Sequence, residues 1–193
     1  MTFLRPFPHY FYHMFYIMKI RNIFALTFFL VSFSFGFAQE KEYIVTNSND
    51  TIYGTLKRKF DLLDRPGVNY IFRDEQEKKR QLDPAEIKLI RSLDGVDGNS
   101  YIATAYGRWY AKRIIEGRIE VYQTVDSTIF YVSKDGSDLE FKNFGGFGSR
   151  KTAHAEIRPL FVDNPEILEE FDTLKGSHAN ILYIIQKYND FHK

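Results

Sequence analysis

The chain has 193 residues, with 26 lysines and arginines, 25 acidic residues and no cysteine. A net charge of +1 lacks the basic excess that nucleic-acid binding requires, so we expect no nucleic-acid partner. The lack of cysteine excludes disulfides, a cysteine nucleophile and a lipid anchor attached to cysteine.

An apolar segment near the N-terminus has the anatomy of a secretory signal peptide. Lys19 and Arg21 supply the positive start, and residues 23–35 are apolar and uncharged. Small residues follow at Gly36 and Ala38, which would be the −3 and −1 positions of a signal-peptidase site. The sequence therefore predicts export.

The predicted cleavage divides the chain into three parts. Residues 1–17 are rich in aromatic side chains and are expected to be an over-extended start, with Met18 the initiator. Residues 18–38 form the signal peptide, and cleavage between Ala38 and Gln39 leaves a mature domain of 155 residues. That length suits a single globular domain with its own core.

Cleavage changes the charge of the protein and decides whether a membrane span remains. Removal of Arg5, Lys19 and Arg21 leaves 23 basic against 25 acidic residues, a net charge of −2. The alternative to cleavage is a retained anchor, because residues 22–39 form an uncharged run close to the ~20 residues that a spanning helix needs. After cleavage we expect no integral membrane span.

The first part of the mature domain, residues 39–143, is expected to be rich in β-structure. Segments of β-favouring residues alternate with Gly, Asn and Asp turns, which predicts an antiparallel meander, or a curved and partly closed sheet. Gly54, inside the second strand, predicts a bulge or a close backbone approach. The strands are expected at 43–46, 51–60, 68–73, 87–93, 101–104, 109–115, 118–125, 128–133 and 139–142.

The last part of the chain predicts helices, so the fold class is expected to be α+β. Residues 144–159 are expected to form a loop and connector, and residues 160–193 an αα-hairpin packed on the sheet. Asn164 and Ser177 are expected to cap the two helices, with Gly176 as a left-handed stop between them.

Two segments approach ligand-binding motifs without completing them. Residues 145–152 resemble a phosphate-binding loop, but Arg150 replaces the second glycine. Residues 94–99 resemble half a calcium loop, but Val96 and Gly98 occupy positions that need oxygen ligands. We therefore expect no cofactor and no metal site, and no catalytic residue is assigned.

The best binding candidate is the segment that contains Tyr106, Arg108, Trp109 and Tyr110. Aromatic side chains beside an arginine could stack on a sugar or dock a peptide, and Trp and Arg are frequent binding anchors. The alternative is structural: the segment would be a strand that enters the core, with Trp109 packed inside.

Three short motifs allow a family comparison. Residues 49–54, Asn-Asp-Thr-Ile-Tyr-Gly, resemble the Gly-Asp-Thr-Ile-x-Gly hairpin of uncharacterised secreted proteins of Gram-negative bacteria. Residues 84–87 and 181–189 resemble a later Pro-x-Glu/Asp-Ile motif and a C-terminal helix of the same proteins. The resemblance implies export and a β-rich domain, and it implies no activity.

Together these features lead to one hypothesis and two alternatives. The hypothesis is a non-enzymatic domain of the periplasm or cell envelope that binds a protein or glycan partner. The first alternative is a small hydrolase with a carboxylate or histidine site. The second is a component of an envelope assembly that pairs through an exposed sheet edge.

Overall fold

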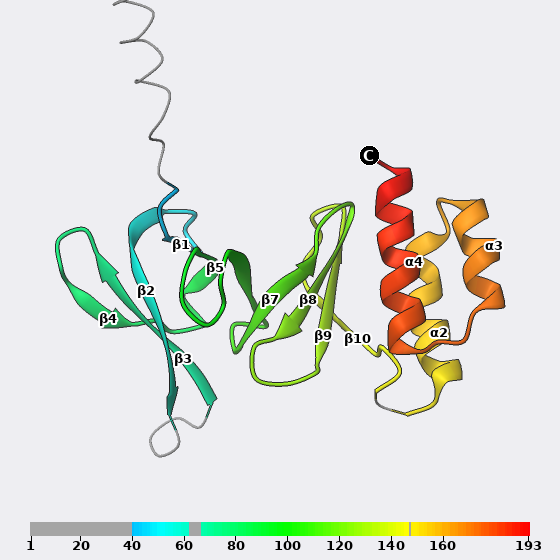
Figure 1. The fold of residues 1–193 in the computed structure, drawn as a ribbon, viewed down its shortest axis with the longest axis horizontal. Coiled ribbons are helices and arrows are strands. Elements are labelled where there is room, and N and C mark those ends of the chain that lie inside the picture. The colour runs from blue at the N-terminus through cyan, green and yellow to red at the C-terminus, as the bar shows by residue number, and fades with distance from the viewer. Residues whose placement is uncertain (1–39, 62–66, 147) are drawn as a thin grey trace, which may run out of the picture. The chain divides into compact units, whose positions relative to one another are not determined.

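The computed structural model describes residues 40–61, 67–146 and 148–193 (Figure 1). Lys41–Lys193 forms one compact unit, to which the following description refers. The predicted signal peptide and the cleavage site at Ala38 and Gln39 lie outside the described residues. Among the helices of the described residues, none has the length and apolar character needed to cross a membrane.

The β-part of the described unit is a single antiparallel sheet of ten strands. The strands are β1 (Tyr43–Thr46), β2 (Thr51–Asp61), β3 (Gly67–Asp74), β4 (Lys79–Gln81), β5 (Ile87–Ser92), β6 (Ser100–Ala105), β7 (Trp109–Ile115), β8 (Ile119–Thr124), β9 (Phe130–Lys134) and β10 (Glu140–Lys142). Their spatial order is β10-β9-β8-β7-β6-β5-β1-β2-β3-β4. The chain thus adds β2 to β4 on one side of β1 and returns to its other side with β5.

The α+β class and the predicted strands are confirmed, and β4 is an additional strand. The sequence does not predict β4 because its three residues are polar and show no apolar alternation. The close backbone approach predicted at Gly54 is confirmed, because a Cβ there would lie 2.2 Å from the carbonyl oxygen of Arg73.

The sheet curls toward one face between β3 and β7. Tyr70 on β3 and Tyr110 on β7 are in edge-to-face contact, with ring centroids 4.8 Å apart. Strands β2, β1, β5 and β6 lie between them in the sheet, so this contact requires strong curvature. The concave side holds a core of Ile44, Tyr70, Phe72, Leu82, Ile87, Ile90, Ile102 and Tyr110.

The sheet curls toward its opposite face between β6 and β10. The backbone N–H of Phe141 on β10 donates to the hydroxyl of Tyr106, which lies in the turn before β7. Beneath this contact, the ring of Tyr106 packs against Tyr131 of β9. The small side chains of Ala103, Ala105 and Ala111 allow the tight bend. They form a buried cluster with Tyr122 and Tyr131.

Three α-helices and a short 3₁₀ helix cover the sheet at β8 and β9. They are α2 (Arg150–Ile157), η1 (Arg158–Phe161), α3 (Pro165–Thr173) and α4 (His178–Phe191). The shared core consists of Ile119, Val121, Phe130, Val132, Phe144, Ala153, Ile157, Phe161, Ile167, Phe171, Ile181, Ile184, Ile185 and Tyr188. As predicted, the side chains of Asn164 and Ser177 cap α3 and α4.

Two details of the helical part differ from the prediction. The segment 144–159, expected to be a loop and connector, contains α2, which buries Ala153 and Ile157 and is capped by Ser149. Gly176 is not among the glycines with a positive φ, so it is not a left-handed stop. A Cβ at Gly176 would lie 2.2 Å from the carbonyl oxygen of Arg150, so glycine is needed there because α2 approaches closely.

A buried asparagine joins α4 to the start of β8. The Asn189 side chain is 2% exposed, and its Oδ1 accepts from the Ile119 N–H at 2.9 Å. Its Nδ2 donates to the Ile119 carbonyl oxygen at 2.7 Å. Gly117 makes room for this side chain, because a Cβ at that position would lie 2.3 Å from Asn189 Cγ. Asn189 therefore supplies the hydrogen bonds that a neighbouring strand would otherwise provide.

A second junction between the helices and the sheet is ionic. Asp163, between η1 and α3, accepts from Lys134 Nζ at 2.7 Å and from the Tyr188 hydroxyl at 2.8 Å. Lys134 Nζ also donates to the Leu160 carbonyl oxygen, and Arg118 lies 3.2 Å from the Asp163 carboxylate. Burial raises the pKa of Asp163, but the hydrogen bonds from Lys134 and Tyr188 outweigh it and bring the pKa down to about 2.

We predict that Asn189→Ala lowers the free energy of unfolding by about 2–4 kcal/mol, because it leaves the N–H and C=O of Ile119 buried and unpaired. Urea unfolding at neutral pH measures the loss. The control is Gln186→Ala, which removes an exposed hydrogen bond on the same helix and should cost less than about 0.5 kcal/mol. Equal effects of the two substitutions would contradict the role of Asn189.

We also predict that the stability contributed by Asp163 depends on pH. Because its pKa in the folded protein is lowered from 3.8, its contribution is complete above about pH 4 and is lost as the pH falls toward 2. Asp163→Asn should therefore have a lower free energy of unfolding than the wild type at neutral pH. The difference between the two free energies should become smaller as the pH falls from about 4 toward 2. Asp138→Asn, which removes one negative charge at an exposed site, is the control.

Candidate functional site

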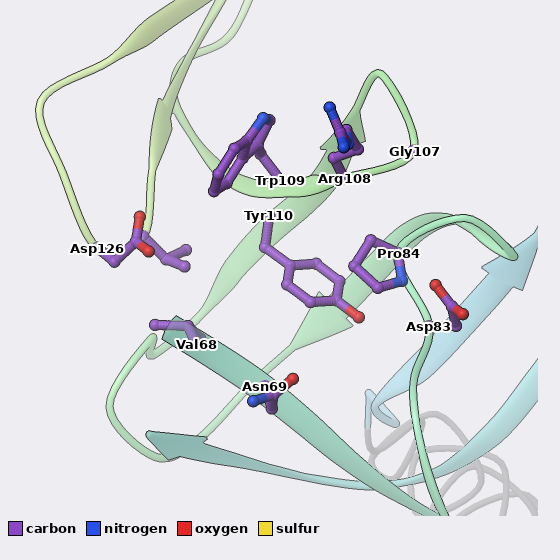
Figure 2. Close-up of a pocket in the computed structure, with 10 residues that line it drawn as sticks. Val68, Asn69, Asp83, Pro84, Gly107, Arg108, Trp109, Tyr110 and Asp126 are labelled. Atoms are coloured by element: carbon purple, nitrogen blue, oxygen red, sulfur yellow. The ribbon is translucent and has the colours of Figure 1, made fainter. Parts of the chain in front are cut away.

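A cleft of about 700 Å³ opens where the first curl of the sheet ends (Figure 2). Four separate segments line it: the start of β3, the turn before β5, the start of β7 and the turn after β8. The lining residues are Val68, Asn69, Asp83, Pro84, Gly107, Arg108, Trp109, Tyr110, Val125 and Asp126. The curvature that brings β3 to β7 thus also assembles this cleft.

Adjacent residues on β7 have opposite roles at the cleft. Tyr110 is 4% exposed, and its hydroxyl donates to the Leu82 carbonyl oxygen at 3.1 Å. Burial, together with the negative charge of Asp83, raises the pKa of the Tyr110 hydroxyl, which therefore remains a hydrogen-bond donor. Because side chains alternate along a strand, Trp109 points away from this core and is 50% exposed. The structural alternative, in which Trp109 packs inside the core, is therefore wrong.

The polar residues of the cleft offer both donors and acceptors. Arg108 is exposed and, within the described part of the chain, takes part in no ion pair. The Asp83 carboxylate accepts from the Ala85 N–H at 2.9 Å, which fixes the turn beside Pro84. Figure 2 shows Arg108 beside Trp109, with Asp83 next to Pro84.

Tyr106, the fourth residue of the predicted binding segment, does not line this cleft. Tyr106 and Gly107 both have a positive φ, which makes the β6–β7 turn tight. The Tyr106 side chain instead lines a separate hollow of about 590 Å³, together with Tyr122 of the second concave face. Its contacts with Phe141 and Tyr131 give it a structural role there.

The sequence did not indicate the other residues of the cleft. Val68, Asn69, Asp83 and Asp126 come from segments with ordinary strand and turn patterns. They line the same cleft as Trp109 because the sheet curls, and a local sequence pattern does not reveal which distant segments the curl brings together.

In the half calcium loop at residues 94–99, the side-chain oxygens of Asp97 and Asn99 are engaged with other residues of the fold. Asp97 is 5% exposed, and its carboxylate pairs with Arg58 at 2.7 Å and with the Tyr70 hydroxyl at 2.8 Å. The Asn99 side-chain oxygen accepts from Arg91. In the described residues, no group of three or more His, Asp or Glu side chains is placed to hold a metal ion.

The glycine-rich loop and the histidines also form no common site in the described part of the chain. The glycine-rich loop at residues 145–152 follows β10, an exposed strand of three residues, whereas a phosphate loop follows a buried strand. His154 stacks on Phe171 at 4.2 Å, and His178 lies beside Phe130 in a different part of the helical core. These histidines have packing roles.

Comparisons with protein-family models, with curated proteins and with solved structures find no match for this chain. The resemblance to secreted proteins of Gram-negative bacteria therefore stays a prediction.

We predict that Tyr110→Phe lowers the free energy of unfolding by about 1–2 kcal/mol, because the Leu82 carbonyl loses its hydrogen-bond donor. Denaturant unfolding checks the value. Tyr53→Phe, at a tyrosine that is 46% exposed on β2, is the matched control and should change stability by less than about 0.5 kcal/mol. A Tyr110→Phe protein as stable as the control would show that the buried hydroxyl does not hold the curl.

Proposed function

We propose that this protein is exported to the periplasm or cell envelope of a Gram-negative bacterium, where it binds a protein or glycan partner without catalysing a reaction. The signal-peptide anatomy of residues 18–38 supports export. The binding site is the cleft around Trp109.

The observation that carries the binding proposal is the position of Trp109. A tryptophan that is 50% exposed keeps a large apolar surface in water, although burial of that surface would be favourable. It lies at the wall of a cleft, beside Arg108, rather than alone on a convex surface. Concave sites with an aromatic wall and a few polar groups are typical of ligand binding.

A small hydrolase is the second candidate, and one observation favours it. Asp83 and Asp126 line the same cleft, and glycoside hydrolysis uses two carboxylates on either side of the scissile bond. Cleavage of a bound saccharide that disappears in both Asp83→Asn and Asp126→Asn would establish this function.

Assembly through a sheet edge has weaker support. The two edge strands, β4 and β10, have three residues each, and both contain charged side chains. Short and charged edge strands are devices that prevent edge-to-edge pairing in natural sheets.

The proposal predicts that the full chain, expressed in a Gram-negative bacterium, sediments with isolated cell envelopes through Trp109. Trp109→Ala should reduce the bound fraction on the order of tenfold, as expected for a binding anchor. Phe191→Ala, at an aromatic residue that is 60% exposed on α4, is the matched control and should bind as the wild type does.

The same sample tests export. Mass spectrometry should find a chain that begins at Gln39 in the periplasmic or envelope fraction. A chain that retains residues 18–38 would contradict cleavage, and envelope binding that is equal in wild type and Trp109→Ala would contradict the proposed site.

A further inference from the structure

We infer that the ligand of the Trp109 cleft is an uncharged saccharide chain, with one sugar ring stacked on the Trp109 indole. This inference rests on the proposed binding function and specifies its ligand. Three properties of the cleft lead to it: its aromatic wall, its pairing of donors with acceptors, and its charge.

The aromatic wall fits the face of a sugar ring. A pyranose presents a face of C–H groups, which is apolar and flat enough to cover an indole. Trp109 lines the cleft and is 50% exposed, whereas the adjacent Tyr110 is buried, so β7 leaves one aromatic side chain available to a ligand. One sugar ring stacked on the Trp109 indole would bury this exposed aromatic surface and leave the core of the protein unchanged.

The polar lining fits the hydroxyl groups at the edge of a sugar. Every sugar hydroxyl is both a donor and an acceptor, so a matching site needs both kinds of group. The Asp126 carboxylate is an acceptor and Arg108 a donor, and neither side chain forms a hydrogen bond to another described residue. Hydrogen bonds from hydroxyls to such charged groups are stronger than those between neutral partners.

The charges of the cleft indicate which saccharides fit. Asp83 and Asp126 carry two negative charges and Arg108 one positive charge, so the charged lining residues sum to one negative charge. A saccharide with many carboxylates or sulfates would be repelled by this lining, whereas an uncharged chain would not. Neutral sugars, including N-acetylated ones, are therefore the favoured class.

A peptide ligand fits the cleft less well. Peptide grooves use apolar pockets for side chains or a free strand for backbone pairing. The apolar residues of the lining apart from the aromatic pair are Val68, Pro84 and Val125, which are small and come from three different segments.

The experiment uses the emission of Trp109, the only tryptophan in the chain, as a direct reporter of the cleft. The full chain is titrated with four probes: chitotetraose, cellotetraose, oligogalacturonate and a tryptic digest of envelope proteins. We expect at least one of the two neutral saccharides to shift and enhance the Trp109 emission, and the anionic saccharide and the peptides to leave it unchanged.

Calorimetry then measures affinity in variants that retain or lack the contacts. Trp109→Ala and Asp126→Asn should each weaken binding of the neutral saccharide on the order of tenfold. Phe191→Ala should bind as the wild type does. Circular dichroism of each variant verifies that the sheet is intact.

The outcomes separate this inference from the proposed function. If neither neutral saccharide binds, the inference is wrong. Trp109-dependent envelope binding would then still support the proposed function, and a response to oligogalacturonate or to peptides would identify a different ligand class. If envelope binding is also independent of Trp109, the inference and the proposed function both fail.

Discussion

The contact of Tyr110 with Tyr70 and with the Leu82 carbonyl is the interaction on which the candidate site depends. It connects two strands that are separated by four others in the sheet, and it therefore fixes the first curl. Because Tyr110 points inward, strand alternation directs Trp109 outward. The same curl brings the carboxylates of Asp83 and Asp126 to the wall that contains Trp109.

The rest of the unit stabilises a sheet that bends in two directions. At the second bend, the small side chains of Ala103, Ala105 and Ala111 allow close packing under the aromatic residues. The helices pack on β8 and β9, where Asn189 pairs with the backbone of Ile119. In this way a helical layer holds the part of the sheet beyond the cleft, and no residue of α2, α3 or α4 lines the cleft itself.

The sequence predicted the features that depend on local patterns. Alternating β-favouring residues marked the strands, and capping residues such as Asn164 and Ser177 marked the starts of α3 and α4. It missed α2 because the helix is mostly polar and buries only Ala153 and Ile157. The spacing of those two residues, one helical turn apart after Ser149, is the signal that could have identified it.

The remaining errors concern contacts between distant segments. The sequence predicts a left-handed stop at Gly176, and this prediction is wrong. Glycine is required there because the carbonyl oxygen of Arg150 in α2 leaves no room for a Cβ. Of the four residues in the predicted binding segment, Arg108, Trp109 and Tyr110 reach the cleft, and Tyr106 supports the opposite face. Which side of a strand faces a cleft depends on the sheet curvature, and that is a property of the whole fold.

The central claim is that the buried Tyr110 holds Trp109 outward in an open cleft. Quenching of the Trp109 emission by acrylamide in the folded protein tests this claim directly. Because the indole is 50% exposed, its quenching constant should lie clearly above zero and below that of the unfolded chain. A quenching constant near zero would show that Trp109 is packed in the core, and it would contradict the account.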